Sequence, residues 1–338
     1  MLEGLFDLHE RLDKLDRVGD PLERLQAAVD WEHFRPALQT VRPPDDPGAA
    51  GRPSYDAVLL FKLLILQSLY NLSDEQLAYQ MLDRLSFTRF LGLSLGARVP
   101  DATTIWRFRD ALSKAGLAKK LFDAFDTFLR LNGFAARKGQ IVDASIVEVP
   151  RQRNRRAENE QLKAGEDVAG WSAAKREQKD TDARWTKKHG VSYFGYKNHV
   201  NVDVRHKFIR DYAVTDASVH DSQVFECLLD ETNSSRDAWA DSAYRSKEKL
   251  AWLEAQGYRE HVQRKGCRDR PLTKWERQGN RTRAKTRSRV EHVFGVMAQK
   301  AGTLLLRGVG IVRASCKIGL RNLAYNLDRY GLLAGLRS

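Results

Sequence analysis

The apolar residues of this chain change their spacing near Gly139, and this change constrains the fold more than any other feature of the sequence. Before it, apolar residues recur every three or four positions, as in Leu5, Leu8, Leu12 and Leu15, which is typical of amphipathic helices. After it, short apolar or alternating runs begin, and these are typical of strands. The runs cover residues 141–142, 194–204, 208–214, 238–240 and 261–263. The sequence therefore predicts an all-helical N-terminal part followed by an α/β domain.

The helical part divides at a turn-rich sequence, VRPPDDPGAAGRP, which begins at Val41. Because proline and glycine interrupt helices there, residues 1–50 are expected to form a helical arm and a hinge. Residues 51–135 are expected to form a separate helical domain. Within it, Ser73 and Gln76 have the spacing of a capping box, which predicts the start of a helix.

The break at Pro100 and Asp101 is followed by a new helical pattern, and a helix-turn-helix places DNA contacts at the start of such a helix. An amphipathic helix that buries Ile105, Phe108 and Leu112 explains the same pattern, and both interpretations can hold on one helix. The candidate DNA contacts are Thr103, Thr104, Arg107 and Arg109.

Residues 136–338 are expected to form the α/β domain. Its first three strand-like runs predict an antiparallel meander, and a polar insert at about 151–190 separates the first two. The insert has few apolar residues, so we expect it to lack a core of its own and to be mobile without DNA. A helix through residues 224–229, a strand, a second helix and a last strand follow, and this order predicts parallel pairing beside the meander.

Three acidic residues are the strongest functional candidates. Asp143 and Asp241 each follow an apolar, strand-like run, and Glu291 lies in a helical pattern after a very basic stretch. If the three carboxylates converge, they would bind a divalent metal ion and act on phosphodiesters. Taken singly, each has a structural explanation: an aspartate after a strand is commonly a turn residue, and Glu291 could pair with Arg287 one helical turn earlier.

The sequence around these acids resembles the DDE transposases of bacterial insertion sequences, in particular the family numbered five. The resemblance runs from about Gly51 to the C-terminus and rests on blocks that occur in the same order in that family. The blocks are GRPSYDAVLLFKLLILQSLYNLSDEQL, VPDATTIWRFRDAL, IVDASIV, YFGYKNHVNVD, ADSAYRSKE and RSRVEHVFG.

The resemblance implies a fold and a set of site residues. It implies a ribonuclease H-like mixed sheet flanked by helices, preceded by an all-helical N-terminal DNA-binding domain, and it maps the catalytic acids onto Asp143, Asp241 and Glu291. The arginine of the family's signature maps onto Arg287. The positions of its tyrosine and lysine hold Ala284 and Ala298, with Lys300 nearby as a substitute.

The charge of the chain favours a polyanionic partner. Lysine and arginine give a net charge of +13, and the basic residues collect around residues 151–156 and 264–289. Net positive charge alone can also increase solubility, and it does not indicate whether a nucleic-acid partner is DNA or RNA.

The sequence also indicates the cellular compartment of the protein. The most apolar stretch, residues 57–70, is interrupted by Lys62 and Gln67, so it predicts a core helix and not a membrane span. We find no pattern of a secretory signal. Three dispersed cysteines support neither a disulfide framework nor a zinc site, so we expect a cytoplasmic, nucleoid-associated protein. The cysteines are Cys227, Cys267 and Cys316.

The expected chemistry uses two Mg²⁺ (or Mn²⁺) ions per active site, because oxygen ligands and phosphate suit a hard cation. Asp143 is expected to bridge the ions, with Asp241 completing one site and Glu291 the other. We expect Asp221 to be a helix N-cap and Glu148 a strand-end residue, both outside the site. Further candidates for contact with DNA are Lys197, His199, Tyr244, Arg245, Arg287 and Lys300, for which a solvated surface position is an equal alternative.

Together these features predict a transposase. It would bind the terminal inverted repeats of its insertion sequence, cleave DNA and transfer the strand into target DNA, working on double-stranded DNA as a dimer or larger assembly. Two alternatives stay open: an impaired or domesticated protein that binds the same repeats without cutting, and a metal-dependent nuclease of the same fold that stops at hydrolysis.

Overall fold

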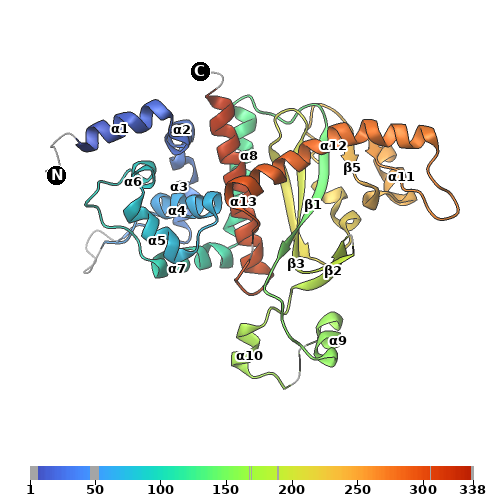
Figure 1. Ribbon diagram of the computed structural model, residues 1–338, viewed down its shortest axis with the longest axis horizontal. Coiled ribbons are helices and arrows are strands. Elements are labelled where there is room, and N and C mark those ends of the chain that lie inside the picture. Colours follow the sequence, from blue (N-terminus) through green and yellow to red (C-terminus); the bar gives the residue numbers. More distant parts are fainter. Residues whose placement is uncertain are drawn as a thin grey trace.

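The computed structural model describes residues 7–45, 53–166, 168, 170–188, 190–304 and 306–335. Helices of the N-terminal part lie on one side of the molecule and a mixed sheet on the other (Figure 1). The long helix α13 (Ile311–Ala334) stands between them, and the small helices α9 (Arg156–Ala164) and α10 (Ala173–Gln178) project from the sheet (Figure 1). The structure confirms a mixed sheet flanked by helices.

The N-terminal part is helical, as predicted. The capping box of Ser73 and Gln76 is present: the Ser73 hydroxyl accepts from the Gln76 N–H at 3.1 Å, and the Ser73 N–H donates to the Gln76 amide oxygen at 2.9 Å. The predicted hinge lies largely in residues 46–52, outside the described residues. The helices are α1 (Asp7–Val18), α2 (Pro21–Ala28), α3 (Arg35–Gln39), α4 (Ala57–Tyr70), α5 (Asp74–Asp83), α6 (Leu85–Leu91), α7 (Ala102–Lys114) and α8 (Leu117–Leu131), with a 3-10 turn at Trp31–Phe34.

In the part of the chain that the structure describes, no single helix is long and apolar enough to cross a membrane. Only α4 and α5 taken together reach that length and composition, and they meet at an angle of 103°.

The sheet has six strands, in the order β2-β3-β1-β5-β6 with β4 paired to β3. The pairs of β3 with β1, β2 and β4 are antiparallel, and the pairs of β5 with β1 and β6 are parallel. The predicted meander and the predicted parallel pairing beside it are both confirmed. The strands are β1 (Gln140–Glu148), β2 (Arg184–Lys188), β3 (Val191–Asp203), β4 (Ile209–Asp216), β5 (Asp237–Ala240) and β6 (Arg259–Val262).

The polar insert is more ordered than the sequence predicts. The side chains of Leu162, Val168 and Trp171 are all at least nine-tenths buried and form a cluster of their own between α9 and α10. The Trp171 indole N–H also donates to Glu158 at 2.7 Å. The prediction that the insert lacks a core was wrong, because three apolar residues, one from α9 and two from the segment after it, meet in space and bury one another.

Two predicted helices differ from those observed. After Asp221 the chain forms two 3-10 turns, Asp221–Val224 and Glu226–Leu228, instead of an α-helix. There the Leu228 carbonyl accepts from the Asn201 amide at 2.6 Å, a tertiary contact with β3 that fixes the path of the chain at this turn. The helix of Glu291, α12 (Lys274–Ala301), includes most of the basic stretch that was expected to precede it. Between these segments, α11 (Lys247–Ala255) begins at its N-cap Ser246, close to the predicted position.

Helix α13 joins the helical part to the sheet. Its buried side chains include Cys316, Leu320, Leu323 and Leu327, which recur every three or four positions, and it packs against α4 and α8 on one side and β4 on the other. One apolar cluster therefore contains residues of α2, α4, α8, β3 and α13. The division into residues 1–50, 51–135 and 136–338 stays a prediction, while the packing shows that these segments share a core.

Candidate active site

Asp143 lies on the central strand of the sheet. It sits within β1 and not at its end, opposite Val200 of β3, and the two residues before it, Ile141 and Val142, are fully buried. One carboxylate oxygen accepts the N–H of Ala144 at 2.8 Å. Burial of the flanking strand therefore fixes the Asp143 side chain at a rigid place in the fold.

Asp241 follows the neighbouring parallel strand. β5 pairs with the beginning of β1 through Ala238 and Trp239, and Asp241 comes directly after its last residue. The Asp241 carboxylate accepts the N–H of Ala243 at 2.7 Å and so caps a short 3-10 turn, Ser242–Tyr244. Because the strands are parallel neighbours, both aspartates approach the same region of the sheet.

Glu291 reaches this region from α12, which contacts β1 and β5. Val290 and Val293 are fully buried and fix the face of the helix that packs on the core, and Glu291 flanks them with an exposed side chain. The Arg287 guanidinium, one turn earlier, donates to Glu291 at 2.8 Å and to Asp143 at 2.8 Å. Arg287 thus links the helix carboxylate to the strand carboxylate.

The carboxyl group of Asp143 lies in a site that disfavours its charged form. Its pKa is raised to about 6, chiefly by burial and to a smaller extent by the charge of Asp241, while the Ala144 N–H and Arg287 act in the opposite direction. The fully buried Tyr244 phenol has a pKa raised well above its usual value, by burial first and then by Asp221, Asp143 and Asp241. Among the described residues, its hydroxyl has no hydrogen-bond partner.

Asp221 belongs to this region, although we expected it to be an N-cap outside the site. The cap is supplied instead by the side chain of His220, which accepts the N–H of Ser222. Asp221 forms an ion pair with Lys197 at 2.8 Å and lies 4.0 Å from His199. His199 is fully buried, and burial lowers its pKa to about 4. The sequence held a signal for this place in the site, since Asp221 follows a histidine at the start of a turn. Because we interpreted Asp221 as a helix cap, that signal was not used.

The other candidate residues are placed in several environments. Arg109 is held by Asp74 and Gln67, and Lys300 by Asp328 at 2.7 Å, so both are engaged within the protein. Arg245 donates to the Val262 carbonyl at 3.1 Å. Asp101, and not Thr103, caps α7 through the N–H of Thr104. Thr103 and Arg107 are exposed on α7, whereas Ile105, Phe108 and Leu112 are buried.

The donors of this site fit a divalent cation. No group of three or more His, Cys, Asp or Glu residues in the described ranges is close enough to hold a metal ion in this conformation, in which Arg287 stands between two of the carboxylates. The oxygen-only donor set is nevertheless what a hard cation prefers. Burial is the main cause of the raised pKa of Asp143, and a cation bound there would favour the charged form of its carboxyl group.

Two acids on neighbouring parallel strands and a third on a facing helix are an arrangement typical of metal-dependent enzymes that act through carboxylates. Residues 135–327 match the family model described as "Transposase DDE domain", and residues 9–111 match "Transposase domain (DUF772)". The first match spans more than half of the chain, so the chain belongs to the transposase DDE family and is a transposase.

Enzymes with this domain use divalent metal ions. Among solved structures, the chain is similar to one of the piggyBac transposase synaptic complex with hairpin DNA. The two share 11% sequence identity over 94% of this chain and 76% of that chain, with a TM-score of 0.49.

Proposed function

We propose that this transposase binds the terminal inverted repeats of an insertion sequence, cleaves the DNA there and transfers the cut strand into target DNA. Double-stranded DNA, as element ends and as target, is the proposed partner. The observation that carries the proposal is the approach of Asp143 and Asp241 on neighbouring parallel strands, with Glu291 linked to Asp143 through Arg287.

Asp143, Asp241 and Glu291 are the proposed catalytic residues and the ligands of two Mg²⁺ or Mn²⁺ ions. Bound there, the ions would activate an oxygen nucleophile and stabilise the leaving oxygen of the phosphodiester. The position of Asp143 on the central strand, next to the strand that leads to Asp241 and linked to Glu291 through Arg287, supports its role as the ligand shared by both ions.

Arg287 and Tyr244 are the proposed helpers of these acids. Once Arg287 releases Asp143, its planar guanidinium can donate two hydrogen bonds to a phosphate. The Tyr244 hydroxyl is protonated at neutral pH, as a phenol ordinarily is, and the raised pKa makes its ionisation harder still, so it can donate a hydrogen bond to a carboxylate or a phosphate. Lys197 holds Asp221 and thereby orients the charge next to His199.

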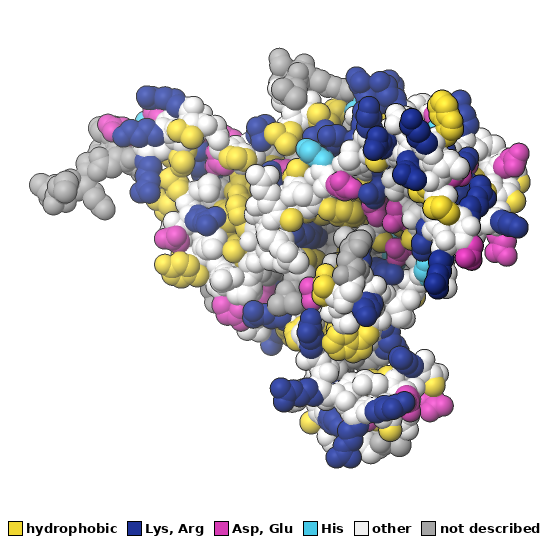
Figure 2. Space-filling view, turned by 45° about the vertical axis from the view of Figure 1, so that its right-hand side comes forward, with side chains coloured by type: hydrophobic (Ala, Val, Ile, Leu, Met, Phe, Trp, Pro, Cys, Tyr) yellow, Lys and Arg dark blue, Asp and Glu magenta, His cyan; other side chains and the backbone are white. Residues whose placement is uncertain are grey.

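The basic residues of α12 are the proposed surface for the DNA backbone. On the face shown in Figure 2, lysine and arginine side chains crowd the region of α12, and aspartate and glutamate side chains lie among them. Arg281 and Lys285 are exposed and one turn apart on this helix. In α7, the exposed Thr103 and Arg107 suit a DNA contact better than Arg109, which is already bonded to Asp74.

The finer assignments follow from the resemblance to the insertion-sequence family numbered five. They are a bacterial origin, a ribonuclease H-like catalytic domain in residues 136–338, and a helix-turn-helix-like DNA-binding domain in residues 51–135. A dimer or larger assembly on DNA follows from the need to join two ends, and a nucleoid-associated place in the cytoplasm follows from the partner.

Two observations favour a second candidate function, a transposase that binds its repeats but cuts poorly. Arg287 bonds to two of the three acids, and the family's signature tyrosine and lysine are replaced by Ala284 and Ala298. An active protein must displace Arg287 from Asp143 before the acids can share an ion.

The test is cleavage and strand transfer on labelled DNA that carries the element's end, with Mg²⁺ or Mn²⁺. We expect products from the wild type, none from Asp241→Asn, and unchanged DNA binding in both. Glu254→Gln, which changes an exposed carboxylate of α11, is the matched control and should retain activity. Binding without products from the wild type would establish the impaired binder instead, and hydrolysis without strand transfer would establish the nuclease.

A further inference from the structure

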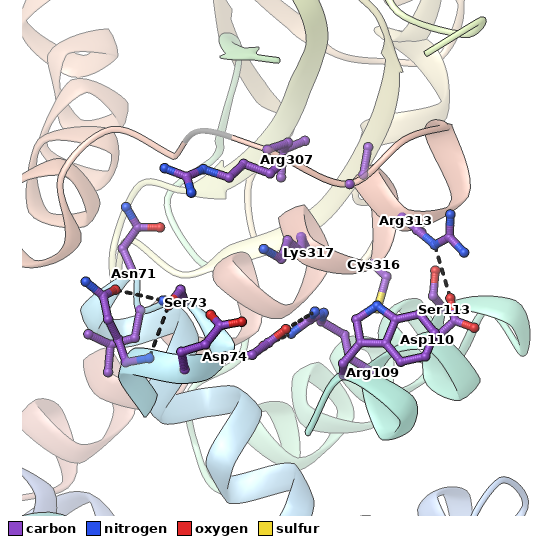
Figure 3. Close-up of a pocket in the computed structure, with 17 residues that line it drawn as sticks. Asn71, Ser73, Asp74, Arg109, Asp110, Ser113, Arg307, Arg313, Cys316 and Lys317 are labelled. Carbon is purple, nitrogen blue, oxygen red and sulfur yellow. Dashed lines mark hydrogen bonds and ion pairs between the residues drawn. The ribbon is translucent and has the colours of Figure 1, made fainter. Parts of the chain in front are cut away.

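A cavity of about 570 Å³ lies where α5 and α7 meet α13 (Figure 3). Its wall comes from the start of α5, one side of α7 and residues 306–317, so it joins parts of the chain that are far apart in sequence. Nothing in the catalytic proposal uses it. The volume is in the range of sites that take small organic ligands.

Most charges of the wall are already paired. Arg109 donates two hydrogen bonds to the carboxylate of Asp74, and Arg313 donates to Asp110 at 3.1 Å. Asp110 also pairs with Lys114 at 2.7 Å. These pairs set the shape of the wall. Because the paired charges are not available to a ligand, the remaining cations decide what the cavity can bind.

Lys317 and Arg307 are those remaining cations. Neither has an ion pair within 4.0 Å among the described residues, and Figure 3 shows both side chains directed toward the same space. Lys317 is partly buried, and burial together with the neighbouring Arg109 lowers its pKa. A partly buried ammonium without a counterion is a site that an anion would stabilise. The third acid of the wall, Glu75, is exposed at the rim and does not neutralise it.

Trp106 adds an apolar platform to this cavity. It is 46% exposed, although it lies on α7 next to the buried Ile105, and it is part of the cavity wall. The exposed indole ring offers a face on which a base can stack. The unpaired cations of the same cavity can bind a phosphate. Such combinations bind unpaired nucleotides, because every base can stack on an aromatic ring.

We propose that this cavity binds one unpaired nucleotide of a DNA strand, with its phosphate at Lys317 and Arg307 and its base against Trp106. The choice of a DNA strand as the source rests on the proposed function, since a free mononucleotide has the same chemistry. The cavity would then recognise DNA whose end is no longer fully paired, separately from the acids that cut it.

The test compares three ligands by fluorescence anisotropy and calorimetry: a blunt duplex, the same duplex with one unpaired terminal nucleotide, and a free deoxynucleoside monophosphate. We expect the wild type to bind the overhang duplex about tenfold more tightly than the blunt one. Trp106→Ala and Lys317→Met should each remove most of that preference and leave blunt-duplex affinity unchanged. Both variants should fold, because Trp106 is exposed and methionine fills the space of lysine without its charge.

The matched controls are Tyr79→Ala, an exposed aromatic of α5, and Lys120→Met, an exposed lysine of α8, and both should keep the preference. Equal wild-type affinity for the two duplexes, or a preference that survives in both cavity variants, would overturn the proposal. Tight binding of the free mononucleotide without a preference between duplexes would overturn the DNA strand as its source. Failure to bind any duplex would count against the proposed function, and the mononucleotide would then still test the cavity.

Discussion

Replacing Gly139 by alanine should damage the parallel strand pair that brings Asp143 and Asp241 together. Gly139 precedes β1 with a φ of +85°, in the left-handed region that favours glycine. A Cβ there would collide with the Trp239 ring and would lie 2.6 Å from the Asp237 carbonyl oxygen, both on β5. The backbone oxygen cannot yield without moving the strand.

Two effects set the magnitude. A non-glycine residue in the left-handed region costs about 1–2 kcal/mol. Forcing extra volume against a packed strand costs about a further 1–3 kcal/mol. The Gly139→Ala variant should therefore lose about 2–5 kcal/mol of the free energy of unfolding. Gly190, in the turn before β3, has a φ of +82°, and a Cβ added there would meet nothing within 4 Å, so Gly190→Ala carries the first effect alone.

Urea unfolding followed by circular dichroism, with both variants measured beside the wild type, tests this reasoning. Gly139→Ala should be less stable than Gly190→Ala by about 1–3 kcal/mol, the share assigned to the collision with β5. Equal stability of the two variants would refute the claim that Gly139 sets the approach of β1 to β5.

Three further predictions concern charge. Arg210 is 4% exposed and donates to Asp203 at 3.0 Å and to Asp126 at 2.8 Å. Arg210→Met should therefore lower the free energy of unfolding, measured in urea, by about 3–5 kcal/mol. A loss below about 1 kcal/mol would contradict this. Hydrogen bonds from Arg259, and further ones from Ser235 and His261, lower the pKa of Asp237. The charged Asp237 carboxylate therefore stabilises the fold above the usual aspartate pKa of 3.8, and this stabilisation is lost as the pH falls below that value. The urea midpoint should then drop more between pH 7 and pH 3 in the wild type than in Asp237→Asn. Equal drops would count against the pairing of Asp237 with Arg259. For DNA binding, Arg281→Gln and Lys285→Gln should each reduce the slope of log affinity against log salt by about 1, and an unchanged slope would remove these side chains from the interface.

The acids could be predicted from the sequence because each has a local signal. Asp143 and Asp241 follow apolar runs, and Glu291 flanks the apolar stripe of Val290 and Val293, so strand and helix patterns alone gave their elements. The meander and the parallel pairing followed from the order of those elements. Their catalytic role stays a prediction.

The contacts around the acids could not be predicted, since they join distant residues. A pair of Arg287 with Glu291, four positions away, was one explanation that the sequence offered, but the bond of Arg287 to Asp143 crosses 144 positions. Lys197 and Asp221 form an ion pair that no local pattern indicates. These contacts depend on the register of β1 with β3 and on how α12 crosses the sheet, which only the packed structure provides.

Local composition also led to wrong predictions for two segments of the chain. The insert has a low apolar content on average, but Leu162, Val168 and Trp171 meet in space and bury one another. The segment after Asp221 has helical spacing of apolar residues, but the bond between Asn201 and the Leu228 carbonyl favours tight turns. In both cases tertiary contacts outweighed the pattern of the segment.

The proposed mechanism requires Asp143, Asp241 and Glu291 to bind divalent metal together. The most direct measurement is titration of Mn²⁺ into the protein, followed by electron paramagnetic resonance of the free ion, for the wild type, Asp143→Asn, Asp241→Asn, Glu291→Gln and the control Glu254→Gln. We expect the wild type and the control to bind Mn²⁺, and each active-site variant to bind it at least tenfold more weakly, the loss of about 1.4 kcal/mol of binding free energy. Unchanged Mn²⁺ binding in Asp143→Asn and Asp241→Asn would contradict it.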